Sequence, residues 1–207
     1  MEIYLDNSAT TKPYQEVVDK MVYALTTDYA NPSSLHRKGI EVEKNIKAIR
    51  QDIARTIGVK DKEIYFTSGG TESNNAIIRG VSNLYKKRKN HIISTEIEHP
   101  SVLNTLKDLE DDGFEVTYLK VDKEGKINIE ELKNSIKPST SLITIMHVNN
   151  EIGTIQPIEE IGKYLKTLKD KVYFHVDAVQ SYAKINFKPS RYNIDFMSVS
   201  GHKLHGP

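Results

Sequence analysis

A lysine that could react with a carbonyl group, Lys203, lies near the end of the 207-residue chain, in the segment SGHKLHGP of residues 200–207. Its amine can form an imine, and Gly201 and Gly206 on either side let the backbone come close to a ligand. The segment directly follows an apolar run, residues 196–199. A single lysine is most often a solvated surface charge, so its chemistry depends on the residues that accompany it.

An acidic and an amide side chain, Asp177 and Gln180, follow the most apolar run of the chain, residues 172–176. A carboxylate there is partly removed from water and gains from a cationic partner, such as a protonated pyridine nitrogen. The charge-assisted hydrogen bond contributes about 1.5–3 kcal/mol. Gln180 could hydrogen-bond a hydroxyl group on the same ring. The alternative role for Asp177 is to cap a helix that follows it.

A glycine turn containing Gly69, Gly70 and Thr71 joins a predicted strand, residues 64–67, to a predicted helix, residues 72–86. Paired glycines free backbone N–H groups at the positive end of the helix dipole, where a phosphate can bind. The spacing matches neither the P-loop nor the dinucleotide fingerprint, which disfavours nucleotide binding. The alternative is an ordinary turn in which Thr71 caps the helix.

His99 and the pair Asn149 and Asn150 are the remaining polar candidates. A histidine can stack on a ring or move protons near neutral pH, although a lone histidine is more often structural. The asparagines could donate to a substrate carboxylate or form a turn before Gly153. A lysine amine, an acidic partner for a pyridine nitrogen, a phosphate-binding turn and a stacking group are together what pyridoxal phosphate requires. The set therefore predicts a pyridoxal phosphate site.

A metal site is the competing interpretation, because His175 with Asp177 and His202 with His205 place nitrogen and oxygen ligands close in the sequence. A metal would leave Lys203 and the glycine turn without roles. We therefore predict no metal.

The elements that must position these residues alternate along the chain. Short apolar runs rich in β-branched and aromatic residues predict six strands, residues 64–67, 91–94, 116–119, 142–146, 172–176 and 196–199. Helical patterns cover residues 35–58, 72–86, 101–111, 129–136 and 158–168. The alternation predicts an α/β fold of three layers, a mostly parallel sheet with helices on both faces. Ligands of such sheets bind at the carboxyl ends of the strands, where the candidate residues lie.

Composition excludes several classes of partner. The 29 basic and 28 acidic residues nearly balance, which gives no reason to expect nucleic acid or an anionic membrane surface. No apolar run reaches the 18 or more residues of a membrane-spanning helix, so we expect a soluble protein. The chain has no cysteine, which rules out disulfides and thiolate ligands within it and fits the cytoplasm.

Five segments, in order along the whole chain, resemble motifs of the cysteine desulfurases of the NifS/IscS type, which are class V aminotransferase-like, fold-type I pyridoxal phosphate enzymes. They are residues 4–11, 67–74, 146–153, 175–180 and 200–203. Five ordered motifs are far more specific than any one of them.

The resemblance implies a role for each matching residue. Lys203 would hold pyridoxal phosphate as a Schiff base, Asp177 would face its pyridine nitrogen, Gln180 would contact its ring hydroxyl, and His99 would stack on the ring and assist proton transfers. Asn150 would lie near the substrate and the cofactor hydroxyl. The phosphate would be held by Gly70, Thr71, Ser200 and His202.

The resemblance also implies the reaction. A homodimeric desulfurase takes sulfur from L-cysteine, leaving L-alanine and a persulfide on an enzyme cysteine, with the freed Lys203 amine removing the substrate α-proton. The sulfur passes to an acceptor such as an iron–sulfur scaffold protein. The alternatives are a selenocysteine lyase, another class V transaminase or lyase, and a non-catalytic folded remnant.

In this family the active cysteine and the arginine for the substrate carboxylate come well after the lysine. We therefore expect residues 1–207 to be most of the large cofactor domain, with residues 1–15 as an N-terminal arm and the small C-terminal domain absent. Such a chain should not turn over cysteine alone.

Overall fold

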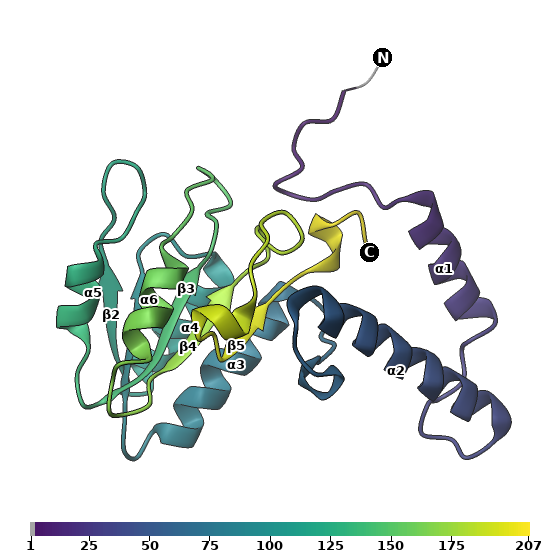
Figure 1. Ribbon diagram of the computed structural model, residues 1–207, viewed down its shortest axis with the longest axis horizontal. Coiled ribbons are helices and arrows are strands. Elements are labelled where there is room, and N and C mark those ends of the chain that lie inside the picture. Colours follow the sequence, from purple (N-terminus) through teal and green to yellow (C-terminus); the bar gives the residue numbers. More distant parts are fainter. Residues whose placement is uncertain (1–2) are drawn as a thin grey trace. The chain divides into compact units, whose positions relative to one another are not determined.

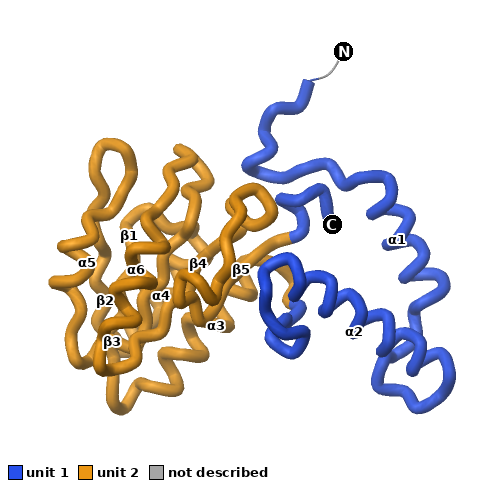
Figure 2. The backbone as a smooth tube through the Cα atoms, viewed as in Figure 1, with its two compact units in different colours: residues 1–66, 201–207 blue, residues 67–200 orange. Residues whose placement is uncertain are grey.

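The computed structural model describes residues 3–207, which form two compact units (Figure 2). Unit 1 consists of Met1–Phe66 and Gly201–Pro207, and unit 2 of Thr67–Ser200. The predicted arm of residues 1–15 begins with two residues that lie outside the described ones. Within residues 3–207, every helix is too short or too polar to span a bilayer.

Unit 2 is built on a sheet of five parallel strands in the order β2-β1-β3-β4-β5. The strands are β1 His91–Thr95, β2 Glu115–Leu119, β3 Thr140–Met146, β4 Tyr173–Asp177 and β5 Phe196–Ser198. Parallel neighbours end at the same edge of the sheet, and the register pairs Met146 with Asp177 and Asp177 with Ser198. Five of the six predicted strands are therefore confirmed.

Four α-helices of unit 2 pack on this sheet, two on each face (Figure 1). They are α3 Gly70–Tyr85, α4 Pro100–Asp111, α5 Ile129–Ser135 and α6 Ile158–Leu165. A short 3-10 helix, η2 Pro189–Tyr192, precedes β5. All four α-helices coincide with predicted ones, and the three-layer α/β fold class is confirmed.

Two apolar clusters explain why apolar residues of the strands lie on both faces of the sheet. Successive strand residues point to opposite faces, so Ile92 contacts the α3 and α4 side while Ile93 contacts the α5 and α6 side. Leu142 and Ile143 of β3 divide in the same way. Because both faces are covered, no position of a central strand is left for a polar solvent-facing residue.

Unit 1 contains α1 Gln15–Thr26, α2 Arg37–Ile57 and the 3-10 helices η1 Asp61–Glu63 and η3 Gly201–Lys203. The predicted helix of residues 35–58 is α2. It ends at Gly58, whose φ of 71° is the left-handed conformation of a helix cap. The helix α1 was not predicted. Its N-cap, Tyr14, makes no side-chain capping bond, so the usual sequence signal of a helix start is weak. None of its residues is buried.

The predicted strand of residues 64–67 is wrong, because this segment pairs with no described strand. Tyr65 and Phe66 are 81% and 53% exposed. The Ile64 carbonyl accepts a hydrogen bond from the Arg50 guanidinium of α2, which also lies 4.7 Å from the centre of the Phe66 ring. The aromatic and β-branched composition of a strand is therefore used here for contacts with a helix.

Candidate cofactor site

The carboxylate of Asp177 closes β4 at the end of the sheet and is only 6% exposed. Its two oxygens accept hydrogen bonds from Val179 N, at 3.0 Å, and from Asn74 Nδ2, at 2.8 Å. Donated hydrogen bonds favour the ionised carboxylate. The residues that follow form turns, so the alternative role of Asp177 as a helix cap is wrong. Gln180 lies in these turns and is half-buried.

The glycine turn begins α3, as predicted, in close contact with the segment after Asp177. A Cβ atom on Gly70 would lie 3.0 Å from Val179 Cγ2 and 3.9 Å from Ser200 Cβ, so any side chain at this position would crowd Val179. The N-cap is Gly69, without a side-chain capping bond. Thr71 lies inside the first turn, which makes the alternative of a Thr71 cap wrong. The N-terminal amides of α3 therefore have no side-chain cap.

His99 is the N-cap of α4, so the structural role considered for it is present. Its Nδ1 atom accepts from Ser101 N at 3.1 Å and lies 2.8 Å from Ser101 Oγ. The residue is nevertheless exposed, in the segment that follows β1. A cap that leaves the imidazole accessible also leaves it able to contact a ligand.

The two asparagines after β3 differ. Asn149 is buried, and its Oδ1 accepts from the backbone N–H groups of Glu151 and Ile152, at 2.9 and 3.0 Å. This is the predicted turn, which reaches Gly153 with a φ of 73°. Asn150 is half-buried, and its Nδ2 donates to Glu151 Oε1 at 2.6 Å.

The lysine segment belongs to unit 1, where it is held by the N-terminal arm. The Lys203 amine donates to the carbonyl of Ala9, at 2.6 Å, and to that of Ser8. Thr11 N donates to the His202 carbonyl at 2.9 Å, and His202 Nδ1 lies 3.1 Å from Thr10 Oγ1. Burial and the charge of Lys203 lower the pKa of His202. The motif of residues 4–11, to which no role was assigned, thus positions the lysine loop.

Two buried polar residues of unit 2 were missed by reasoning from the sequence. Asn74 is 1% exposed and lies on the same face of α3 as Ile78 and Val81. A polar residue within an apolar helical stripe is the signal that could have identified it. Glu98 is 4% exposed and accepts from Met146 N, at 2.9 Å, and from Thr95 Oγ1. Burial raises the pKa of Glu98 from its ordinary value of 4.5 to about 8.

His175, the first residue considered as a metal ligand, is not available to a metal ion. His175 is fully buried, with Nδ1 2.8 Å from Thr144 Oγ1 and Nε2 3.0 Å from Ser198 Oγ, so both ring nitrogens are engaged. Burial lowers its pKa to about 3. Over residues 3–207, no group of three or more histidine or acidic side chains is placed to hold a metal ion.

The chemistry of unit 2 fits pyridoxal phosphate at two points. A buried carboxylate with two donors, Asp177, suits a protonated pyridine nitrogen, and the amides at the start of α3 suit a phosphate. Ser200 lies against the same turn as Gly70. Unit 2 also carries His99, Asn150 and Gln180, whereas unit 1 carries His202 and Lys203.

Comparison with known proteins gives consistent matches. A mitochondrial cysteine desulfurase from Candida albicans is 50% identical over 206 residues, which are 99% of this chain and 42% of that protein. The solved structure of a NifS-like protein has a TM-score of 0.97 and 42% identity, covering 100% of this chain and 57% of that one. A structure of SspA in complex with cysteine has a TM-score of 0.95 and 42% identity, covering 100% and 59%.

The chain spans less than half of the length of the Candida relative. Its match to the family described as aminotransferase class-V extends over residues 3–207. The family assignment predicted from the five motifs is therefore confirmed, and the chain belongs to the class-V aminotransferase family.

Proposed function

We propose that this protein is a pyridoxal phosphate-dependent cysteine desulfurase, which converts L-cysteine to L-alanine and leaves the sulfur as a persulfide on an enzyme cysteine. The observation that carries the proposal is the buried Asp177 carboxylate, with its two donors, at the strand end next to the Gly70 turn. An anion and a phosphate-binding helix start so close together match the two ends of one cofactor. The printed name of the Candida relative supports the choice of reaction.

Each predicted site residue keeps its proposed role. Asp177 would hold the proton on the pyridine nitrogen, Gln180 would contact the ring hydroxyl, and His99 would stack on the ring. Asn150 would lie near the substrate. The phosphate would be bound by Gly70, Thr71, Ser200 and His202. When bound, pyridoxal phosphate supplies an electron sink for the charge that develops on the substrate α-carbon.

The Lys203 amine would anchor the cofactor through its aldehyde carbon and then, once the substrate amine has replaced it, take the proton from the substrate α-carbon. The carbonyl of Ala9, which accepts from this amine, would hold it in place. His99 would deliver and remove protons during sulfur release. The nucleophile that receives the sulfur would come from outside these 207 residues, since they contain no cysteine.

The substrate, the assembly and the location of the protein belong to the same proposal. The chain would form most of the large cofactor domain, with the arm contributing to the lysine loop. L-cysteine as the substrate is supported by the cysteine complex of the SspA structure. We also propose a homodimer, an iron–sulfur scaffold protein as sulfur acceptor and a cytoplasmic location. Fractionation of the source cells tests the location, because the Candida relative is named as mitochondrial.

Cofactor binding can be tested on the 207-residue chain. After pyridoxal phosphate is added and the unbound cofactor is removed by gel filtration, we expect the chain to keep a visible absorbance band that borohydride removes, and Lys203→Ala to abolish this band. Lys107→Ala is the matched control, since Lys107 is an exposed residue of α4 outside the proposed site. A band that survives Lys203→Ala, or no band at all, would contradict the proposal.

Turnover is a separate measurement. The 207-residue chain should form neither alanine nor sulfide from L-cysteine, because its nucleophile is missing. A chain extended to the length of its relatives should form both in the presence of a thiol. Alanine formation by the 207 residues alone would show that the assigned nucleophile is wrong.

A further inference from the structure

One buried amide, that of Asn74, connects the two residues proposed to hold the cofactor ring. Its Nδ2 atom donates to Asp177 Oδ2 at 2.8 Å and to Ser101 Oγ at 2.9 Å. Ser101 Oγ in turn lies 2.8 Å from His99 Nδ1. An unbroken chain of hydrogen bonds therefore runs from Asp177 to His99, entirely within unit 2.

The orientation of the Asn74 amide is fixed by charge. If the amide were turned over, its oxygen would face the Asp177 carboxylate, and two acceptors would repel each other. With Nδ2 facing Asp177 and Ser101, the Asn74 oxygen has no hydrogen-bond partner among residues 3–207. A buried polar atom without a partner costs free energy, so stability alone does not explain an asparagine at this position.

The direction of these hydrogen bonds determines which nitrogen of the His99 ring carries the proton. Because Asn74 donates to Ser101 Oγ, the hydroxyl hydrogen of Ser101 is free to point at His99 Nδ1. The backbone N–H of Ser101 also points at Nδ1, at 3.1 Å. Nδ1 is therefore an acceptor, and the neutral imidazole carries its proton on Nε2.

We propose that Asn74 is a positioning residue that selects the Nε2–H tautomer of His99 and couples it to the Asp177 carboxylate. The proposal rests on the proposed function only for the roles of His99 and Asp177 toward the cofactor. When the cofactor is bound, Asn74 would keep Nε2 of His99 as the nitrogen that donates a proton. The same amide donates to the carboxylate that serves the pyridine nitrogen.

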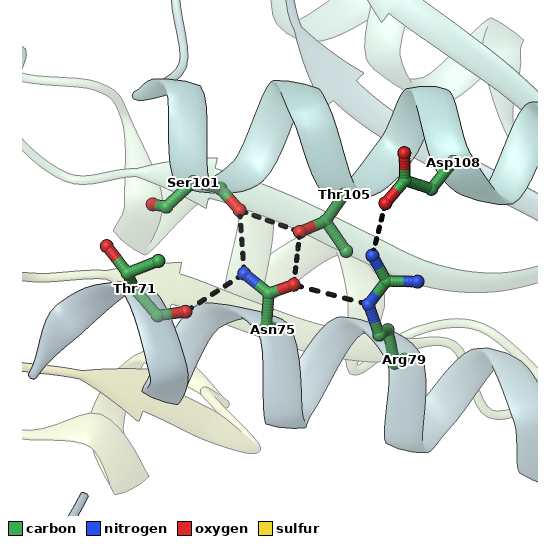
Figure 3. Close-up of polar contacts among 6 residues, drawn as sticks. All are labelled: Thr71, Asn75, Arg79, Ser101, Thr105 and Asp108. Carbon is green, nitrogen blue, oxygen red and sulfur yellow. Dashed lines mark hydrogen bonds and ion pairs between the residues drawn. The ribbon is translucent and has the colours of Figure 1, made fainter. Parts of the chain in front are cut away.

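The neighbouring residue, Asn75, provides a control on the same helix. Figure 3 shows that Asn75 donates to the backbone carbonyls of Thr71 and Ser101 and accepts from Thr105 and Arg79. It joins α3 to α4 through the carbonyl of Ser101, whereas Asn74 contacts the hydroxyl. Both asparagines therefore contact Ser101, but only Asn74 belongs to the series of hydrogen bonds that leads to His99.

The experiment compares Asn74→Asp with Asn75→Asp in the 207-residue chain without cofactor. The ¹⁵N resonances of the histidine rings report the tautomer of His99, measured at about pH 8.5, where an ordinary imidazole is neutral. An aspartate at position 74 would share one proton with the adjacent Asp177 carboxylate, and its other oxygen would accept from the Ser101 hydroxyl and turn it away from Nδ1. We expect the ratio of Nε2–H to Nδ1–H tautomers of His99 to fall by about two- to tenfold.

Asn75→Asp makes the same substitution one position along α3 and is expected to lower Tm while leaving this ratio at the wild-type value. If Asn74→Asp does not fold, Ser101→Ala removes only the hydroxyl and should lower the ratio in the same direction. The proposal is overturned if the variant that folds keeps the wild-type ratio, or if Asn75→Asp changes it equally. Absence of the pyridoxal phosphate absorbance band would instead contradict the proposed function and leave the tautomer result standing.

Discussion

The two units of the chain differ in how they bury apolar residues. In unit 2 the strands β1 and β3 have no exposed residue, and large side chains such as Phe174 are completely enclosed. In unit 1 the helix α1 has no buried residue, and Leu25 and Leu35 are 77% and 94% exposed. Unit 2 therefore carries most of the core of the described chain.

This difference explains where sequence patterns are informative. A strand covered on both faces carries consecutive apolar residues that point to opposite sides, as Ile92 and Ile93 do, and such runs are visible without a structure. The apolar residues Val18, Met21, Val22 and Leu25 of α1 also recur at helical spacing, but they are exposed, so a helical pattern alone does not show burial. The contrast also predicts different costs for equivalent substitutions in the two units.

The largest expected effect on the free energy of unfolding is that of Phe174→Ala in β4. Removing a completely buried ring should lower the free energy of unfolding by about 3–5 kcal/mol. Leu25→Ala in α1 is the matched substitution in unit 1 and should change it by less than about 0.5 kcal/mol, because Leu25 is 77% exposed. Urea unfolding followed by circular dichroism measures both. Equal effects would show that the two units do not differ in packing.

A second effect comes from the buried Glu98 carboxyl of unit 2. Its pKa of about 8 exceeds its ordinary value of 4.5, so between these pH values the folded state binds a proton that the unfolded state has lost. The contribution of Glu98 to the free energy of unfolding is fully present below about pH 4.5 and is lost as the pH rises to about 8. His175, with its pKa lowered to about 3, acts in the opposite direction between about pH 3 and 6.5.

Of these two groups, only Glu98 changes its contribution between about pH 6.5 and 8. Between about pH 6.5 and 8, the wild-type chain should lose about 2 kcal/mol more stability than Glu98→Gln, which cannot ionise. Urea unfolding at several pH values gives the two slopes. Parallel pH dependences would show that Glu98 is ionised in the folded chain.

The sequence was sufficient for the fold class, five strands and four helices of unit 2, because their periodicity reflects burial. It was insufficient for residues 64–66, whose strand-like composition serves contacts with Arg50. Composition describes which residues suit a sheet, and it does not reveal whether a partner strand is present. The order of the strands in the sheet was not predicted either.

For the site, single residues could be proposed from their place after strands, but their connections could not. Asn74 and Asp177 are 103 positions apart, and Lys203 and Ala9 are 194 apart. Such contacts depend on how elements pack, and no local spacing encodes them. The roles of the nine proposed site residues toward the cofactor stay predictions, which the Lys203→Ala experiment begins to test.

The smallest expected effect is that of Gly80→Ala in α3, which we compare with Gly70→Ala at the start of the same helix. A Cβ atom on Gly70 would lie 3.0 Å from Val179 Cγ2, whereas nothing lies within 4 Å of one on Gly80. Gly80→Ala should raise the free energy of unfolding by about 0.5–1 kcal/mol, through helix propensity alone. Gly70→Ala should instead lower it by about 1–3 kcal/mol, because Val179 must move.

The pair also separates packing from ligand binding at the start of α3. Val179→Ala combined with Gly70→Ala removes the crowding atom and should restore stability to within about 0.5 kcal/mol of the Val179→Ala chain. If the affinity for pyridoxal phosphate recovers together with stability, Gly70 acts through packing against the segment after Asp177. If affinity stays low while stability recovers, the methyl group obstructs the phosphate itself, and the turn is a direct part of the site.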